Sequence, residues 1–183
     1  MTARDQDLIK TIAQLSILEE FDPIRTLNES FVLTSLPSLE QIGACFVTIN
    51  LNNQLRGCIG SLEAHRSLYE DIVFNAKSAA FADPRFKPIN FFEYQNLEYE
   101  ISILSKTTQI DYTDMDDLRQ KIRPNVDGVI IEFGNKSATF LPQVWEDLKY
   151  FDDFFISLAQ KADLAPTILD DRPIIKTYQV DKF

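Results

Sequence analysis

The chain has 183 residues, 45% of them hydrophobic and 11% aromatic, a composition that predicts a packed core rather than disorder. Lys and Arg total 18 against 28 Asp and Glu, and the formal net charge of −10 disfavours general nucleic-acid binding, because phosphates are negative too. The two cysteines, Cys45 and Cys58, are too few for a disulfide framework. Without a signal-peptide pattern or an apolar run of membrane-spanning length, we predict a cytoplasmic protein with no membrane contact.

The first 61 residues predict two helices and a hairpin. Apolar residues recur at helical spacing over 3–20, a segment that Pro23 is expected to close, and a shorter helix is predicted over 28–35. Residues 46–51 and 55–61 read as strands joined by a turn at Asn52-Asn53, because asparagine tolerates positive φ. A two-residue turn would place Val47 opposite Cys58.

The middle of the chain predicts a capped helix followed by a strand. Ser67 and Glu70 have the spacing of a capping box, which opens a helix running toward Ala82. Residues 97–103 alternate between apolar and polar side chains, as in a half-buried strand.

The C-terminal third predicts a second group of elements. Asp114 and its acidic neighbours open a short helix through Arg123, and a hairpin is expected over 128–133 and 138–141. A helix begins near Trp145, and 174–180 reads as a last strand. The stripe of Phe151, Phe154, Phe155 and Leu158 along this helix predicts a core face, and an exposed remainder such as Phe154 would instead offer a partner surface. Hairpins with helices between and after them indicate an α+β fold, with a mostly antiparallel sheet, packed helices and a smaller α/β subdomain. We predict one domain over 1–183, with a weak subdomain boundary near 104–112.

The segment Leu55–Leu62 is the best candidate for a functional site. It holds Gly57 and Gly60, two of only five glycines, and glycine inside a strand marks a bulge or a close approach to the backbone. If the run is extended, Arg56 and Cys58 project from one face. A guanidinium at that distance could leave a more nucleophilic thiolate.

A second candidate segment is the loop Asp83–Pro88, made rigid by two prolines. It presents Asp83, Arg85 and Lys87. Segment 55–90 holds five Lys or Arg against four Asp or Glu, a relatively basic stretch in an acidic chain that suits a small anionic ligand.

Each of these residues also has a structural interpretation. Cys58 suits a small buried hydrophobe, and Arg56 and Arg85 suit ion pairs with Glu100 and Asp83. The single histidine, His65, could join Glu63, Asp71 and Cys58 in a metal site, but the spacing matches no ligand pattern, so we predict no metal and no cofactor.

The chain resembles the AMMECR-one domain family, named for a chromosomal region linked to Alport syndrome, midface hypoplasia and elliptocytosis. The resemblance covers most of residues 43–164, and Asp163 stands where the family usually has glycine. The motifs that carry it are Gly43–Thr48, Leu55–Gly60, Ala79-Ala80, Asp83–Phe86, Leu97–Ser105, Asp127–Val129, Phe140–Trp145 and Lys161–Leu164.

The resemblance implies helices packed on an antiparallel sheet with a smaller subdomain, and the Leu55–Gly60 motif beside a cleft. It supplies no established reaction. It also implies a shared pathway with a Memo-like protein and a radical S-adenosylmethionine protein, since family members are often fused to them or encoded beside them.

Two functional hypotheses follow. The first is an enzyme or enzyme component that binds a small anionic ligand in a cleft around Leu55–Leu62. Arg56 and Arg85 would orient the ligand, Gly57 and Gly60 would allow its close approach, and Cys58, Asp83 or Glu100 would do proton or covalent work. The alternative is a non-catalytic adaptor that binds a Memo-like or radical S-adenosylmethionine partner.

Overall fold

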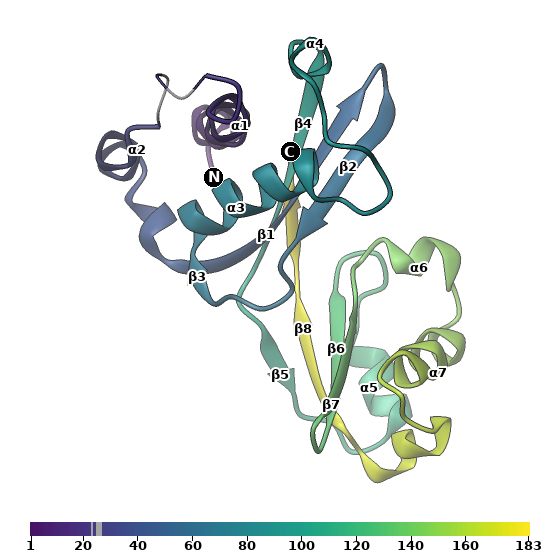
Figure 1. Ribbon diagram of the computed structural model, residues 1–183. Coiled ribbons are helices and arrows are strands. Elements are labelled where there is room, and N and C mark those ends of the chain that lie inside the picture. The colour runs from purple at the N-terminus through teal and green to yellow at the C-terminus, as the bar shows by residue number, and fades with distance from the viewer. Residues whose placement is uncertain (23, 25–26) are drawn as a thin grey trace. The chain divides into compact units, whose positions relative to one another are not determined.

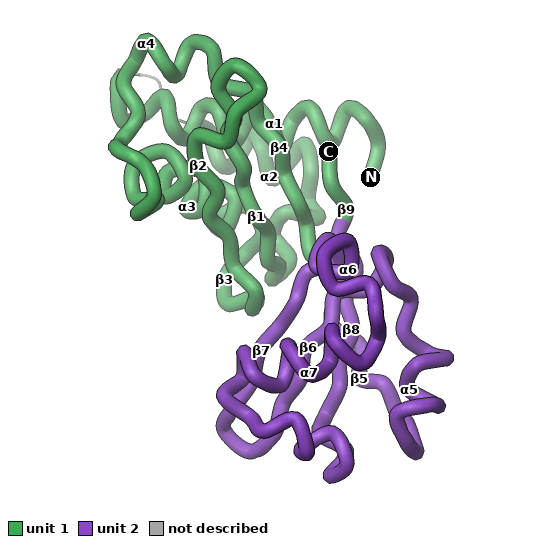
Figure 2. Tube along the Cα trace, turned by 90° about the vertical axis from the view of Figure 1, so that its right-hand side faces the viewer, with its two compact units in different colours: residues 1–104, 181–183 green, residues 105–180 purple. Residues whose placement is uncertain are grey.

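The structure is a computed structural model that describes residues 1–22, 24 and 27–183. Pro23, the expected end of the first helix, lies outside the described residues. The described chain divides into two compact units (Figure 2), unit 1 with residues 1–104 and 181–183, and unit 2 with residues 105–180. The division falls after Leu104, the first residue of the range 104–112.

Unit 1 is built of helices and an antiparallel sheet in the order β2-β1-β4-β9, with β3 paired to β1 (Figure 1). Its elements are α1 (Ala3–Leu18), α2 (Glu29–Ser35), the 3₁₀ helix η1 (Pro37–Glu40), β1 (Ile42–Leu51), β2 (Gln54–Gly60), β3 (Arg66–Ser67), α3 (Leu68–Phe81), α4 (Phe91–Tyr94), β4 (Leu97–Leu104) and β9 (Val180–Lys182).

Local sequence signals explain several of these boundaries. Ser67 and Glu70 form the predicted capping box at the start of α3. Asn52 and Asn53 have φ of 53° and 60°, as a tight hairpin turn between β1 and β2 requires. Alternate residues of β1, namely Cys45, Val47 and Ile49, are fully buried against the apolar sides of α1 and α3, and these form the core of unit 1.

The register of the β1–β2 hairpin differs from the prediction. Thr48, not Val47, lies opposite Cys58, because Ile49 pairs with Gly57 whereas Asn50 pairs with Leu55. Arg56 is therefore the extra residue of a β-bulge, which shifts the register by one position and breaks the regular alternation of side chains there.

Unit 2 is a second antiparallel sheet, in the order β5-β8-β6-β7, with helices. Its elements are β5 (Thr108–Ile110), α5 (Met115–Lys121), β6 (Gly128–Phe133), β7 (Lys136–Phe140), α6 (Val144–Asp147), α7 (Phe151–Lys161), the 3₁₀ helix η2 (Pro166–Asp171) and β8 (Ile174–Tyr178). The α+β class with antiparallel sheets is thereby confirmed.

The core of unit 2 confirms that the stripe along α7 is a core face and contradicts the alternative of an exposed Phe154. Phe154 is fully buried and stacks on Trp145 with ring centroids 3.5 Å apart, so it offers no exposed surface to a partner. Asp163 has φ of 55° directly after the last turn of α7, where Leu164 N–H donates to the carbonyl of Ala159. This left-handed position explains why glycine suits it in the family, and why aspartate is tolerated there.

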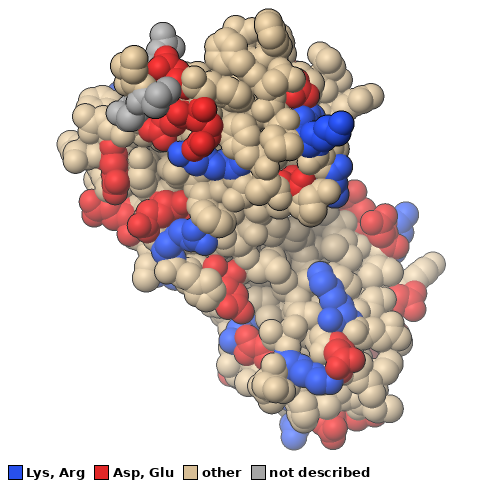
Figure 3. All heavy atoms as spheres, viewed as in Figure 1, with Lys and Arg blue, Asp and Glu red and all other residues tan. Residues whose placement is uncertain are grey.

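Among the described helices, none has both the length and the apolar character needed to cross a membrane. On the face shown in Figure 3, Lys and Arg side chains are separated from one another by acidic and neutral residues, and they form no continuous basic area.

Candidate functional site

The loop that follows α3 closes the open edge of β2. Asp83 accepts the main-chain N–H of Cys58 at 2.9 Å, and an Arg85 guanidinium nitrogen donates to the Cys58 carbonyl at 3.2 Å. Together they satisfy main-chain groups that β2, as the edge strand of its sheet, would otherwise present to solvent.

Asp83 is the carboxylate of this loop, and it accepts several hydrogen bonds. Its side chain is 1% exposed and also accepts three hydrogen bonds from Arg85, from the main-chain N–H, Nε and a terminal nitrogen. The Arg85 hydrogen bonds, and behind them the main-chain donors, hold the pKa of Asp83 well below its usual range although burial acts the other way. The expected Arg85–Asp83 ion pair is therefore present, and Asp83 is a fixed anion at neutral pH.

Arg56 does not contact Glu100, as the structural interpretation expected. Its Nε donates to Glu93 Oε1 of α4 at 2.8 Å, and a terminal nitrogen donates to the Lys87 carbonyl at 2.8 Å. This ion pair lowers the pKa of Glu93. The side chain is only 14% exposed, so the guanidinium fastens α4 and the loop to β2 and has little surface left for a ligand. Glu100 pairs instead with Lys182 at 3.0 Å.

Arg85 is the guanidinium that contacts Cys58, through a hydrogen bond from a terminal nitrogen to the Cys58 carbonyl at 3.2 Å. The pKa of Arg85 is raised first by its hydrogen bonds with Asp83 and then, among smaller causes, by the charge of Cys58 and a hydrogen bond to its side chain. Arg85 is 54% exposed, so water and small solutes reach it. The two residues are 27 apart in the chain. The bulge at Arg56 breaks the regular alternation from which we predicted that Arg56 and Cys58 share one face.

Cys58 lies on the sheet face opposite the helices. Gly57, the residue before it, faces α3, so alternation turns the Cys58 side chain away from the core. The thiol is half-buried and accepts a hydrogen bond from Thr48 Oγ1 at 3.3 Å. Cys45, in contrast, is fully buried, and burial, aided by the charge of Asp71, raises the pKa of its thiol far above the usual range.

The glycines of the motif lie against the protein itself. A Cβ at Gly57 would come within 2.1 Å of the Ala79 carbonyl oxygen, and one at Gly60 within 2.3 Å of the Phe46 ring. The close approach at Gly57 is therefore made by α3, and the one at Gly60 by the Phe46 side chain of β1. Contact of either glycine with a ligand stays a prediction, as does the cleft.

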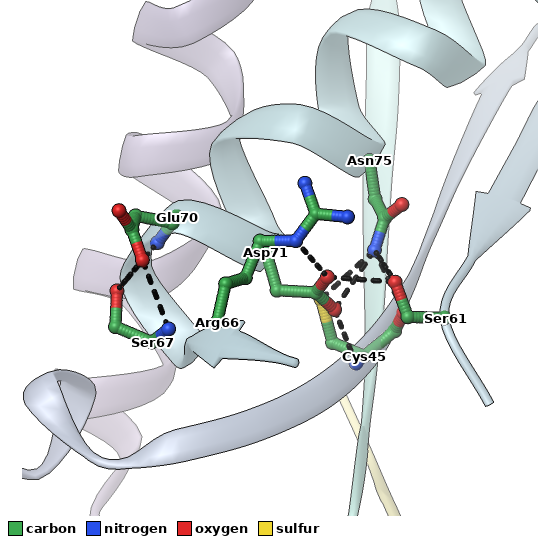
Figure 4. A network of polar contacts seen from close by, with 7 residues as sticks. All are labelled: Cys45, Ser61, Arg66, Ser67, Glu70, Asp71 and Asn75. Atoms are coloured by element: carbon green, nitrogen blue, oxygen red, sulfur yellow. Dashed lines mark hydrogen bonds and ion pairs between the residues drawn. The ribbon is translucent and has the colours of Figure 1, made fainter. Parts of the chain in front are cut away.

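A buried polar network in unit 1 was missed by the sequence reasoning (Figure 4). Asp71 of α3, with a side chain 2% exposed, accepts from Cys45 N–H at 2.9 Å, from Ser61 Oγ at 2.6 Å and from Asn75 Nδ2 at 2.9 Å. Arg66 Nε lies 3.3 Å from the same carboxylate. The sequence pattern that could have predicted this network is a pair of polar residues, Asp71 and Asn75, spaced four apart in α3. They lie on the same side of the helix as the buried Ile72, Ala76 and Ala79.

The side chains named for a possible metal site do not form one group. Within residues 1–22, 24 and 27–183, His, Cys, Asp and Glu form no group of three suited to a metal ion. His65 is exposed and lies 3.2 Å from Glu63, as expected for a surface loop.

Comparison with known proteins identifies the family of this α+β chain with two antiparallel sheets. The AMMECR1 family model matches residues 10–183, so the chain belongs to the AMMECR1 family. Protein SSO0193 of Saccharolobus solfataricus is 35% identical over 178 residues, covering 93% of this chain and 77% of that protein. A protein of Thermofilum pendens is 31% identical over 169 residues, covering 87% and 78%.

The fold has a close counterpart among solved structures. The crystal structure of the uncharacterized protein PH0010 from Pyrococcus horikoshii matches with a TM-score of 0.79 and 27% identity, covering all of this chain and 92% of that one.

The Asp83 interactions predict a specific dependence of stability on pH. Since the folded-state pKa of Asp83 lies below its unfolded value of about 4, its stabilisation is complete above about pH 4 and is lost as pH falls toward the folded-state pKa. We expect Asp83→Asn to cost about 2 kcal/mol at neutral pH, a modest figure because half-exposed Arg85 is screened by water. The difference from wild type should shrink steadily below about pH 4.

Urea unfolding of both proteins across this pH range measures the difference. Asp152→Asn removes an exposed carboxylate that also pairs with an arginine, and it should show no such trend. A difference between Asp83→Asn and wild type that stays constant down to acid pH would contradict the assigned role.

Proposed function

We propose that this protein binds a small anionic ligand on the Cys58 side of the unit 1 sheet, as an enzyme or enzyme component. The observation that carries the proposal is the half-exposed Arg85 guanidinium, which donates to the main-chain carbonyl of Cys58 at 3.2 Å, next to a half-buried thiol. Arg85 is the cation of the motif that solvent reaches, and a guanidinium fork is suited to carboxylates and phosphates.

The surroundings hold this pair in a fixed geometry. Asp83 fixes the Arg85 guanidinium through two side-chain hydrogen bonds and fixes β2 through Cys58 N–H. The Arg56–Glu93 ion pair anchors the same strand from α4. Binding sites gain affinity when their groups are positioned before the ligand arrives, and this network provides such positioning.

The chemistry assigned to each residue follows from its environment. Arg85 orients the anion, and Cys58 is the nucleophile or the group that carries a covalent adduct, with Thr48 donating to its sulfur. Asp83 is a positioning residue, because an anion with four donors is a poor proton carrier near neutral pH. Glu100 of β4 lies opposite Thr48 of β1 in the sheet. With Asp83 assigned to positioning, Glu100 is the carboxylate that we assign to proton transfer.

Thermal stabilisation by phosphate and by small carboxylates such as malonate and pyruvate tests the proposal. We expect a rise in melting temperature that Arg85→Gln abolishes and Cys58→Ser reduces, and a bound anion should slow alkylation of Cys58 by iodoacetamide. Lys87→Gln is the matched control, since it removes the same charge from the same exposed loop. Equal loss of stabilisation in Lys87→Gln and Arg85→Gln would reduce the effect to general charge and contradict the proposal.

A second candidate, the adaptor, is favoured by exposed apolar side chains near α4. Phe92 is 80% exposed and Leu55 43% exposed, and the Arg56–Glu93 ion pair joins the two neighbouring backbone segments. The partner would be the Memo-like or radical S-adenosylmethionine protein implied by the family resemblance. Co-purification with such a protein that Phe92→Asp abolishes and Cys58→Ser leaves intact would favour the adaptor over the ligand-binding function.

A further inference from the structure

The β1–β2 hairpin brings the Thr48 hydroxyl to the sulfur of Cys58. The main-chain N–H and C=O of Cys58 are both bonded to the loop after α3, at Asp83 and Arg85, so they point away from β1. Thr48 and Cys58 are therefore a non-hydrogen-bonded pair of the antiparallel ladder, in which the Cα atoms lie only about 4.5 Å apart. This pairing explains how Thr48 Oγ1 comes within 3.3 Å of Cys58 Sγ.

The sheet holds Thr48 in place. The residue lies in β1, which is paired to β2 on one side and to β4 on the other, with Thr48 in register between Cys58 and Glu100. Its branched Cβ restricts rotation of the side chain. The hydroxyl is therefore positioned at the sulfur before a ligand binds, and little further side-chain entropy is lost on binding.

A hydroxyl fixed at this distance favours the ionised form of the sulfur. A thiol and a hydroxyl can each donate weakly to the other, whereas a thiolate carries no hydrogen and can only accept. Hydrogen bonds to an ionised group are about twice as strong as those between neutral groups, so the Thr48 hydroxyl bonds more strongly to the thiolate than to the thiol. The thiolate is the form of cysteine that attacks electrophiles.

The charged groups around this pair compensate one another. On the loop side, Arg85 is joined to Asp83 at 2.7 Å. Across β1, Glu100 of β4 is joined to Lys182 of β9 at 3.0 Å. Because each cation is matched by an anion, their effects on the sulfur largely cancel, and a cysteine nucleophile then needs another source of activation. The Thr48 hydroxyl is bonded directly to the sulfur and supplies it.

We propose that Thr48 is a positioning residue of the unit 1 anion site, whose hydroxyl favours the Cys58 thiolate that attacks a bound electrophile. The inference rests on the proposed function, because that function assigns Cys58 as the nucleophile. It adds a residue of β1, ten positions away in the chain, to the loop residues that contact Cys58.

The rate of Cys58 alkylation by iodoacetamide tests this role, measured from about pH 6 to about pH 10 with the modified peptide identified by mass spectrometry. We expect Thr48→Val to slow the reaction about tenfold near neutral pH, the factor that loss of one hydrogen bond to an ionised group produces. Near about pH 10 the two rates should converge, because cysteine thiols there are largely ionised without such a bond. Thr48→Ser, which keeps the hydroxyl, should restore most of the rate.

Two controls separate this role from a structural one. Cys45 is fully buried, so its labelling reports opening of the fold and should stay absent in every variant. Thr108→Val removes an exposed strand hydroxyl from unit 2 and should leave the rate unchanged. Thr48→Ala, which lacks the hydroxyl without adding a methyl group in its place, should behave as Thr48→Val does. Wild-type rates at every pH in these two variants, or equal slowing at every pH, would overturn the proposal.

The anion measurements distinguish this inference from the function on which it rests. If phosphate and small carboxylates do not raise the wild-type melting temperature, the anion site is contradicted, while a pH-dependent effect of Thr48→Val still supports the role of the hydroxyl at the sulfur. If the anions do stabilise the protein and Thr48→Val keeps the wild-type pH profile of alkylation, the role of Thr48 alone is overturned.

Discussion

Replacing Gly57 by alanine is expected to destabilise the protein by about 3 kcal/mol or more, at the upper end of what overpacking costs. The new Cβ would lie 2.1 Å from the Ala79 carbonyl oxygen and 3.0 Å from the Ala79 carbonyl carbon. Both are backbone atoms of α3, so a rotamer change cannot make room for the methyl group. β2 and α3 would have to separate, with loss of packing on both.

Urea unfolding followed by far-UV circular dichroism measures this cost. Trp145, the single tryptophan, lies in unit 2 and Gly57 in unit 1, so fluorescence adds a probe of the other unit. Gly134→Ala is the control, because a Cβ there meets nothing within 4 Å and only the positive φ of 60° opposes it, at about 1 kcal/mol. A Gly57→Ala protein as stable as Gly134→Ala would show that β2 and α3 are not in close contact.

Asp71→Ala should cost about 3–5 kcal/mol, since it removes one partner from a buried charged network. The substitution leaves the main-chain N–H of Cys45, the Ser61 hydroxyl and the Asn75 amide without their common acceptor (Figure 4). Buried donors without an acceptor lose their hydration and gain nothing in exchange. Asp71→Asn, which keeps the shape and one acceptor oxygen, should fall between wild type and Asp71→Ala.

Glu70 supplies the matched control for this prediction. It is the neighbour of Asp71 in α3, is exposed, and closes the capping box with Ser67. Glu70→Ala therefore removes a carboxylate from the same helix without burying an unpaired donor. If the two alanine variants unfold at similar urea concentrations, the Asp71 network does not stabilise the fold as described.

The features that the sequence predicted correctly depend on neighbours in the chain. The Ser67–Glu70 capping box and the Asn52-Asn53 turn use residues at most three apart. The hydrogen bonds and backbone angles that stabilise them lie within these few residues. The alternation over residues 97–103 likewise needed only the pleat of a strand, and the structure has β4 there.

The errors all concern contacts between residues far apart in the chain. Arg56 finds Glu93, 37 residues away, and Arg85 reaches the Cys58 carbonyl over 27 residues. The helical spacing within α7 did predict a core face that includes Phe154, but its partner Trp145, which α6 supplies, came only from the structure. One bulge at Arg56 was sufficient to exchange Val47 for Thr48 opposite Cys58.

The sequence by itself determined the net negative charge, the α+β class, the hairpin turn and the helix start at Ser67. Only the tertiary structure decided which guanidinium contacts Cys58 and which carboxylate pairs with each arginine. It also showed that α3 packs directly against Gly57. The physical reason is that caps, turns and side-chain periodicity are set by local backbone energetics. Ion pairs and bulge registers depend instead on which loops the whole fold brings to a strand edge, and a single sequence carries no local signal for that.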